Sequence, residues 1–222
     1  MIKAVVFNLD GTLLDTEGLN CVATGNILKK FGYDLPNYTA WYHENCAGIG
    51  IAKILEKIEN AFAITINDKD NLIAGFREYR KDFFKDNPIP IKKGAVELLE
   101  FVKKQGLKMA ICSGSHTEQI QLKTKTAGLS LDYFDVFVGG DMVGENQKPH
   151  PAPYLLTCEK LGVTPQDIIV IEDGNAGIES AHSAGCRIIL VPDGVNSESA
   201  KEKAWKIVKS LDLVIPIIKE LA

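Results

Sequence analysis

Four short segments of the chain combine carboxylates, hydroxyls and a lysine with small residues. They are Phe7-Asn8-Leu9-Asp10-Gly11-Thr12, Cys112-Ser113-Gly114-Ser115, Lys148-Pro149-His150-Pro151 and Glu172-Asp173-Gly174-Asn175. Three of them directly follow a hydrophobic run that is typical of a buried strand, and the lysine segment precedes a helical pattern. In open α/β sheets, ligands bind beyond the carboxyl ends of the strands. The sequence therefore predicts that these segments meet at one edge of a sheet.

The residue types at this edge suit phosphoryl transfer. That reaction needs a nucleophile in line with the leaving group and positive charge around the phosphoryl oxygens. Lys148 supplies a fixed positive charge, while Ser113 and the backbone N–H groups at Gly114 can hydrogen-bond phosphate oxygens. These residues are therefore candidates for binding the group that is transferred.

The carboxylates of the same segments suit a metal ion and a proton transfer. Asp10, Glu172 and Asp173 are ligands of the kind that hold Mg²⁺. Asp10 lies two residues beyond position 8, a proximity that suits a general acid for the leaving alcohol. Each segment alone is also typical of a turn or a helix cap. Their order and their shared place at strand ends favour a functional site.

Strand-like and helical patterns alternate over most of the chain, which predicts an α/β fold with βαβ units and a parallel sheet. Short β-branched runs predict strands at Ala4–Leu9, Leu107–Cys112, Asp135–Val138, Ile168–Ile171 and Arg187–Val191. Longer segments between them carry apolar residues at helical spacing.

Residues 15–87 interrupt this alternation and predict an inserted helical domain. Apolar residues near 3.6-residue spacing predict helices at Glu17–Phe31, Ile51–Phe62 and Asp68–Phe84. We therefore expect a catalytic core made of residues 1–14 and 88–222 and a helical cap made of residues 15–87. The second connection contains Pro88 and Pro90, which suit a stiff hinge.

Composition excludes several classes of protein. The chain has 222 residues, 45% of them hydrophobic, and a net charge of −4 without a basic run, so a nucleic-acid partner is not expected. Its apolar stretches are too short to span a membrane, and its first residues resemble a strand rather than a signal peptide. Five cysteines without a CxxC pair predict reduced thiols in a cytoplasmic protein. We expect a monomer.

The four motifs together resemble the haloacid-dehalogenase superfamily over essentially the whole chain. The matching segments are FNLDGTLLDTE, CSGS, KPHPAPY and IEDGNAGIESAHSAG. The chain is most similar to capped phosphatases in the branch that contains β-phosphoglucomutase and small phosphosugar phosphatases. The resemblance implies a Rossmann-like parallel-sheet core, a mobile cap, an aspartyl-phosphate intermediate and Mg²⁺.

The resemblance also implies a role for each matching residue. Asp10 is expected to be the general acid/base, with its backbone carbonyl on the metal. Ser113 and Lys148 are expected to bind the transferring phosphoryl group. Asp173 is expected to ligate Mg²⁺, and Glu172 to act on the metal directly or through water.

One position departs from the family pattern. The first carboxylate, which is both nucleophile and metal ligand, corresponds to Asn8. An amide has no anionic oxygen to attack phosphorus and is a neutral metal ligand, so we expect an inactive form that binds Mg²⁺ weakly. Asn8 is either an engineered Asp-to-Asn change or a natural feature of a non-catalytic relative. The other intact site residues favour the engineered change.

Candidate substrate-binding residues in the cap are Asn20, Gly48, Gly50 and Arg77. The two glycines precede a helix, whose free N–H groups could contact a substrate oxygen, although the loop is equally typical of an ordinary turn. Arg77 could contact an anionic or hydroxyl-rich substrate, although a solvated helix face is the simpler interpretation. Asn20 corresponds to a histidine in the related mutases. An asparagine in place of that histidine favours hydrolysis over mutase chemistry.

These observations predict a Mg²⁺-dependent phosphatase that acts on a small phosphorylated metabolite of the sugar or polyol phosphate class. One alternative is a phosphosugar mutase similar to β-phosphoglucomutase. A second alternative, motivated by Asn8, is a non-catalytic protein that binds a phosphorylated metabolite.

Overall fold

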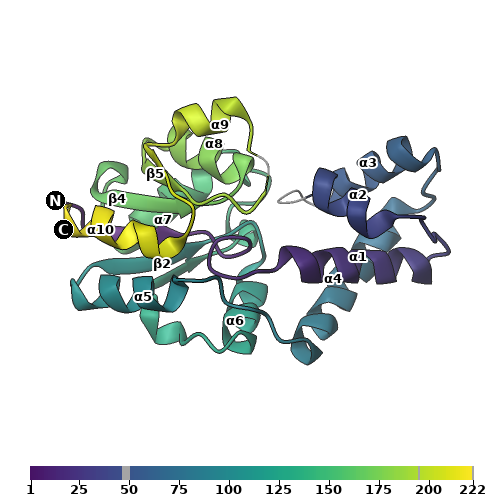
Figure 1. The fold of residues 1–222 in the computed structure, drawn as a ribbon, viewed down its shortest axis with the longest axis horizontal. Helices are drawn as coiled ribbons and strands as arrows, with labels where there is room; N and C mark the ends of the chain where they lie inside the picture. The colour runs from purple at the N-terminus through teal and green to yellow at the C-terminus, as the bar shows by residue number, and fades with distance from the viewer. Residues whose placement is uncertain (47–50, 195, 222) are drawn as a thin grey trace. The chain divides into compact units, whose positions relative to one another are not determined.

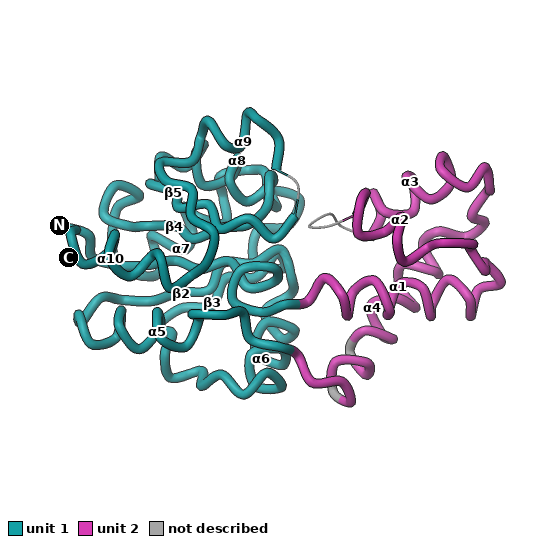
Figure 2. The backbone as a smooth tube through the Cα atoms, viewed as in Figure 1, with its two compact units in different colours: residues 1–15, 90–222 teal, residues 16–89 magenta. Residues whose placement is uncertain are grey.

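The computed structural model describes residues 1–46, 51–194 and 196–221 (Figure 1). The chain divides into two compact units (Figure 2). The first unit joins Met1–Asp15 to Pro90–Ala222, and the second contains Thr16–Ile89. The first boundary lies one residue further along the chain than expected, and the second lies two residues further along. Both fall within the two connections that the sequence indicated.

Within the described residues, the first unit contains a six-stranded parallel sheet in the order β3-β2-β1-β4-β5-β6. The strands are β1 (Ala4–Phe7), β2 (Lys108–Cys112), β3 (Val136–Val138), β4 (Ile168–Glu172), β5 (Arg187–Leu190) and β6 (Lys206–Ile207). The predicted fold class is confirmed, but β6 was not predicted. It is a two-residue, exposed edge strand without the buried apolar run that marks the others.

Helices cover both faces of the sheet, which explains why the central strands β1 and β4 are buried along their whole length (Figure 1). Side chains of α7 and α8 pack with Ala4 and Val6 of β1 in one large hydrophobic cluster. The helices of this unit are α5 (Ala95–Lys104), α6 (Thr117–Thr126), α7 (Ala152–Leu161), α8 (Asn175–Ser183), α9 (Glu198–Lys203) and α10 (Val214–Lys219).

The strand order places β1 between β2 and β4, whose carboxyl ends lie at the same edge. Ala4 pairs with Lys108 on one side and with Ile168 on the other. The chain crosses from one side of β1 to the other, and ligands of doubly wound sheets bind at such switch points. The segments that follow β1, β2 and β4 therefore meet where the sequence predicted a site.

The second unit is helical and has its own hydrophobic cluster. Its described helices are α1 (Glu17–Lys30), α2 (Tyr38–Asn45), α3 (Ile51–Phe62) and α4 (Lys69–Asp86). Leu28, Tyr42, Leu55 and Leu72 bring all four helices into this cluster. Helix α2 was not predicted individually, because its buried residues are only Tyr38 and Tyr42.

The two segments that connect the units run side by side within the first unit. Leu14 and Ile91 form an antiparallel bridge. The Asp15 N–H donates to the Pro90 carbonyl at 2.8 Å, and the Lys92 N–H donates to the Leu13 carbonyl at 2.9 Å. The chain thus leaves and re-enters the sheet unit through a hydrogen-bonded ribbon.

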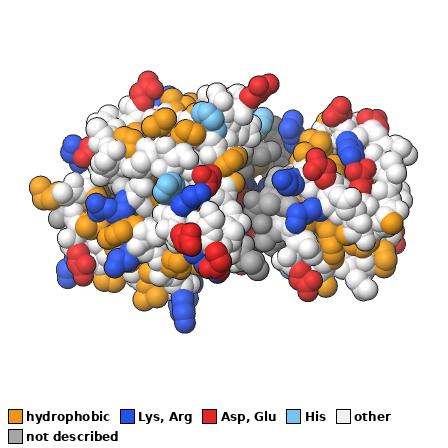
Figure 3. Space-filling view, turned by 90° about the horizontal axis from the view of Figure 1, so that it is seen from above, with side chains coloured by type: hydrophobic (Ala, Val, Ile, Leu, Met, Phe, Trp, Pro, Cys, Tyr) orange, Lys and Arg blue, Asp and Glu red, His pale blue; other side chains and the backbone are white. Residues whose placement is uncertain are grey.

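Acidic and basic side chains are interspersed on the face drawn in Figure 3, which shows no continuous basic area. In the part of the chain that the structure describes, no helix has the length and apolar character needed to span a membrane.

Candidate active site

The side chain of Asn8 lies at the centre of the predicted site. Its amide nitrogen donates to the Asp10 carbonyl at 2.9 Å and to the Asp173 carboxylate at 2.8 Å. Its amide oxygen accepts a hydrogen bond from the Lys148 ammonium at 3.3 Å. The structure therefore brings residues of three of the four sequence motifs into direct contact at residue 8.

A tight turn after β1 makes this approach possible. Gly11 has a φ of +81°, a backbone conformation that side chains with a Cβ atom rarely adopt. A Cβ atom there would also lie 2.3 Å from an oxygen of Asp173. The next residue, Thr12, donates from its hydroxyl to the Asp173 carboxylate at 2.5 Å. The turn thus fixes the loop after β1 against the loop after β4.

Lys148 reaches the site from the loop before α7. Its ammonium donates to the Cys112 carbonyl at 2.9 Å and to Glu172 at 2.6 Å, and it lies 4.8 Å from the centre of the Tyr154 ring. Burial alone would lower the pKa of Lys148, but the adjacent Glu172 carboxylate, together with Cys112 and Asp173, outweighs it, so the pKa is raised. Lys148 therefore stays a cation, beside the Ser113 loop.

Glu172 supports Lys148 and is 1% exposed. One carboxylate oxygen accepts from Lys148 and from the Tyr154 hydroxyl, the latter at 2.7 Å. The other accepts from the backbone N–H groups of Asp173 at 3.1 Å and Gly174 at 3.4 Å. Protein donors thus occupy both oxygens, and the contacts seen here position the lysine. The proposed action of Glu172 on a metal stays a prediction.

The loop after β2 links the predicted phosphate ligands to Asp10. Ser113 is buried, and its hydroxyl oxygen accepts from the Ser115 N–H at 3.1 Å, while Gly114 is exposed. The Ser115 hydroxyl donates to the Asp10 carboxylate at 2.9 Å. The Lys123 ammonium, on α6, also contacts this carboxylate. Neither Ser115 nor Lys123 was predicted as a site residue.

The oxygens around residue 8 fit a magnesium site. The Asp10 carbonyl and one Asp173 oxygen both lie within hydrogen-bonding distance of a single atom, the Asn8 amide nitrogen, so they converge on one point. A carbonyl, a carboxylate and the oxygen of residue 8 are the hard donors that Mg²⁺ prefers. Among the described residues, no three acidic, histidine or cysteine side chains cluster as metal ligands usually do. The proposed site is different because only one of its three donors is a side-chain carboxylate.

The surroundings of Asp173 are electrostatically unfavourable for a carboxylate. Burial, together with the negative charge of Glu172, raises the pKa of Asp173 to about 8, despite hydrogen bonds from Thr12 and Asn8 that favour the carboxylate. A positive ion beside Asp173 would offset this penalty. The hydrogen bond from the Asn8 amide offsets only part of this penalty, because an amide carries no net charge.

The predicted cap residues are more scattered than those of the core. Asn20 lies on α1, and its side-chain oxygen is buried without a hydrogen-bond partner in the described part of the chain. Arg77 is exposed on α4. Arg80 lies one turn further along, stacks on the Phe76 and Phe84 rings at 5.2 and 5.0 Å, and has a buried Nε atom without a described hydrogen-bond partner. Gly48 and Gly50 lie outside the described residues.

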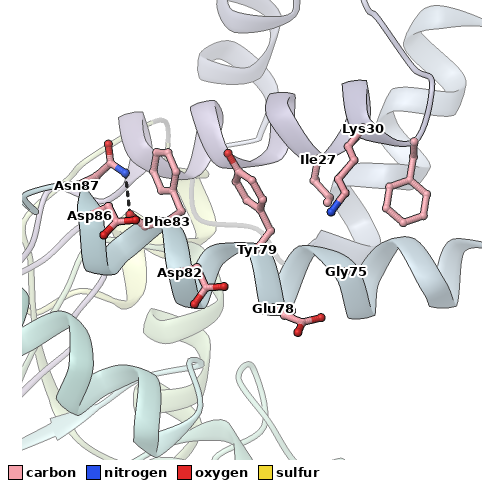
Figure 4. Close-up of a pocket in the computed structure, with 10 residues that line it drawn as sticks. Ile27, Lys30, Gly75, Glu78, Tyr79, Asp82, Phe83, Asp86 and Asn87 are labelled. Carbon is pink, nitrogen blue, oxygen red and sulfur yellow. Dashed lines mark hydrogen bonds between the residues drawn. The ribbon is translucent and has the colours of Figure 1, made fainter.

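A surface hollow within the cap does not coincide with any predicted site residue (Figure 4). It has a volume of about 550 Å³ and lies between α1 and α4. Tyr79 and Phe83 point from α4 toward α1, whereas Glu78 and Asp82 project away from α1 (Figure 4). The acidic groups therefore face solvent rather than converge on a ligand position.

Comparison with known proteins agrees with this geometry. Residues 5–191 match the model of the haloacid dehalogenase-like hydrolases. The chain is 32% identical to a phosphorylated carbohydrates phosphatase of Thermotoga maritima, over 99% of this chain and 100% of the relative. It is 30% identical to a phosphoglycolate phosphatase of Aquifex aeolicus, over 96% and 95% of the two chains.

A solved structure also shares the fold over nearly its whole length. The crystal structure of β-phosphoglucomutase from Clostridium difficile superposes with a TM-score of 0.77 at 27% identity, covering 99% of this chain and 96% of that one. The similar proteins thus include both phosphatases and a mutase.

Proposed function

The chain belongs to the haloacid dehalogenase-like hydrolases, and we propose that its site removes the phosphoryl group from a small phosphorylated metabolite. The observation that carries this proposal is the convergence at residue 8. A lysine, a carboxylate and a carbonyl all contact the side chain at the position where the nucleophile belongs. Positioning and electrostatics are most of what phosphoryl transfer requires.

With an aspartate at position 8, the residues of the site can perform both halves of a hydrolysis. The carboxylate attacks phosphorus and accepts the phosphoryl group, while Ser113 and Lys148 bind its oxygens. Asp10 donates a proton to the leaving alcohol and then takes a proton from the water that hydrolyses the aspartyl-phosphate. Residue 8, the Asp10 carbonyl and Asp173 would hold Mg²⁺, whose charge offsets that of the phosphoryl oxygens.

With Asn8 the same site lacks turnover for two independent reasons. The amide has no anionic oxygen, so it cannot form the aspartyl-phosphate. Its nitrogen also donates to the two oxygens that would face the metal, which opposes cation binding. The network around Asn8 is otherwise complete, which supports the proposal that Asn8 replaces an aspartate. The same network also supports the alternative of a protein that only binds phosphorylated metabolites.

The proposed substrates are sugar or polyol phosphates. The similarity to a phosphorylated carbohydrates phosphatase along the whole chain supports this class. The mutase alternative is supported by the solved β-phosphoglucomutase. Hydrolysis is favoured because Asn20 replaces the histidine of the mutases. Free phosphate as the product identifies a phosphatase, and an isomeric sugar phosphate identifies a mutase.

The decisive experiment is the Asn8→Asp reversion. We expect the Asn8 protein to show no phosphate release above background, and the reverted protein to hydrolyse phosphomonoesters only with Mg²⁺. Activity should disappear on addition of EDTA and return with excess Mg²⁺. If the folded Asn8→Asp protein is as inert as its parent across a broad substrate panel, the phosphatase proposal fails and the binding alternative replaces it.

A further inference from the structure

The buried side chain of Lys123 contacts Asp10, the proposed general acid/base. The proposed mechanism gives this lysine no role. Lys123, on α6, is 1% exposed. Its ammonium contacts both carboxylate oxygens of Asp10 and lies 2.9 Å from the Ser115 hydroxyl oxygen. Ser115 in turn donates to Asp10 at 2.9 Å. The three side chains therefore form a closed triangle around one carboxylate.

The position of Lys123 on its helix explains how it reaches this carboxylate. Helix α6 begins at Thr117, just after the loop that contains Ser113 and Ser115. Lys123 shares the buried face of the helix with Ile120 and Thr124. Helical side chains lean toward the amino-terminal end of their helix, so a long side chain here extends back to the loop. It thereby arrives at the carboxyl ends of β1 and β2.

An ammonium is an unfavourable choice for this position unless it has a specific partner. Transferring an unpaired charge into the interior is strongly unfavourable, whereas an apolar side chain of similar length carries no such penalty. Asp10, whose side chain is 21% exposed, is the partner. A lysine at this position is thus explained by what it does to Asp10.

We propose that Lys123 is a positioning residue which, together with Ser115, fixes the orientation of the Asp10 carboxylate for its proton transfers. The inference rests on the proposed function of this site. A general acid/base works within about 2.6–3.2 Å of the atom that it protonates. Without Lys123 and Ser115, the side chain of Asp10 could rotate away from one fixed direction.

The same contacts couple Asp10 to the phosphate-binding loop. The Ser115 N–H donates to the Ser113 hydroxyl oxygen, while the Ser115 side chain holds Asp10. One loop thus sets both the phosphoryl position and the direction of the proton donor. Misplacing a reacting group by about 1 Å can cost roughly 100-fold in rate, so this coupling matters for turnover rather than for binding.

Kinetics in the Asn8→Asp background separate positioning from a structural role. We expect Lys123→Met to lower kcat by about 10- to 100-fold while KM changes by less than about threefold. Lys123→Arg, which keeps the charge, should recover part of the loss. Lys125→Met, at an exposed position of the same helix, serves as the control and should leave kcat unchanged. An unchanged kcat in Lys123→Met would overturn the proposal.

A crystal structure of the Lys123→Met variant gives a readout that does not need activity. We expect the Asp10 carboxylate to change its side-chain rotamer or to adopt two conformers, with Ser113 in place. An Asp10 side chain that keeps its orientation would refute the positioning role, even if the Asn8→Asp protein proves inert and the phosphatase proposal has failed. If Lys123→Met does not fold, Ser115→Ala removes the second contact, and the same structural comparison applies.

Discussion

The polar side chains at the sheet edge and those in the helical cap differ in how completely they are hydrogen-bonded. At the sheet edge, Glu172 accepts hydrogen bonds on both carboxylate oxygens, and Lys148 contacts three acceptors. In the cap, Asn20 and Arg80 each have a buried polar atom without a hydrogen-bond partner among the described residues. The Lys148–Glu172 pair is thus saturated with contacts, whereas Asn20 and Arg80 retain hydrogen-bonding capacity.

The difference indicates how the work is divided between the two regions. A fully bonded network is rigid and presents preorganised charges, which is what a transition state needs. An unsatisfied buried polar atom costs about 1–3 kcal/mol, and a ligand that supplies its partner recovers this energy. We therefore expect chemistry to depend on the sheet edge and substrate choice to depend on the cap.

The largest expected effect lies in the saturated region. In the Asn8→Asp background, Lys148→Ala should lower kcat/KM by about 100- to 10,000-fold, because it removes a fixed charge at the phosphoryl oxygens and leaves Glu172 buried without its cation. Steady-state phosphate release measures the effect, and Lys160→Ala on the exposed face of α7 is the matched control. A loss below about tenfold with an intact fold would show that Lys148 is not part of the machinery.

A smaller effect should follow from changing the proposed metal ligand. Asp173→Asn in the Asn8→Asp background should raise the Mg²⁺ concentration for half-maximal activity by about 10- to 100-fold, since a neutral amide replaces a charged donor. The measurement is a Mg²⁺ titration of phosphate release. Asp167→Asn, just before the amino end of the same strand, should leave the titration unchanged. An unaltered Mg²⁺ requirement in Asp173→Asn would contradict the metal assignment.

The cap should respond in substrate affinity rather than in rate. In the Asn8→Asp background, Arg80→Gln should raise KM for phosphorylated carbohydrates by about tenfold with kcat within about threefold, which corresponds to one hydrogen bond to a charged group. Arg77→Gln, on the exposed side of the same helix, should change neither constant. A larger effect for Arg77 than for Arg80 would reverse the assignment within this helix.

The last expected effect is on the folding stability of the cation-free Asn8 protein rather than on turnover. Since folding raises the pKa of Asp173 to about 8, the native state binds a proton more tightly than the unfolded chain does. The free energy of unfolding should therefore fall as pH rises from about 5 to about 8, by at most about 1.4 kcal/mol for each pH unit. Urea unfolding at several pH values measures this slope. Asp173→Asn should flatten it, and identical slopes for both proteins would exclude Asp173 as its source.

The sequence predicted the backbone of the site better than the surroundings of each side chain. Asn8, Ser113 and Asp173 directly follow buried strands, and parallel pairing alone brings such positions to one edge. The pattern also predicted a helical insert. It could not predict β6 or α2, because neither has an apolar run or stripe of the usual length.

The residues that escaped prediction are those whose role depends on tertiary contacts. Tyr154 lies on the buried face of α7, and only the fold shows that its hydroxyl reaches Glu172. A lysine in a helix is normally solvent-exposed, so Lys123 gave no signal. A buried tyrosine hydroxyl needs a partner, however, and this requirement could have directed attention to Tyr154.

The pairing of β1 has a consequence for how the chain folds as it is synthesised. Ala4 pairs with Lys108 and Ile168, so both neighbours of the first strand emerge from the ribosome long after it. The insert, residues 16–89, is complete before either neighbour exists and can collapse around its own cluster. Pairings so distant in sequence form slowly, and unpaired apolar strands are prone to aggregate. The four apolar residues of β1, Ala4–Phe7, must therefore stay free of non-native contacts in the nascent chain until β4 has been synthesised.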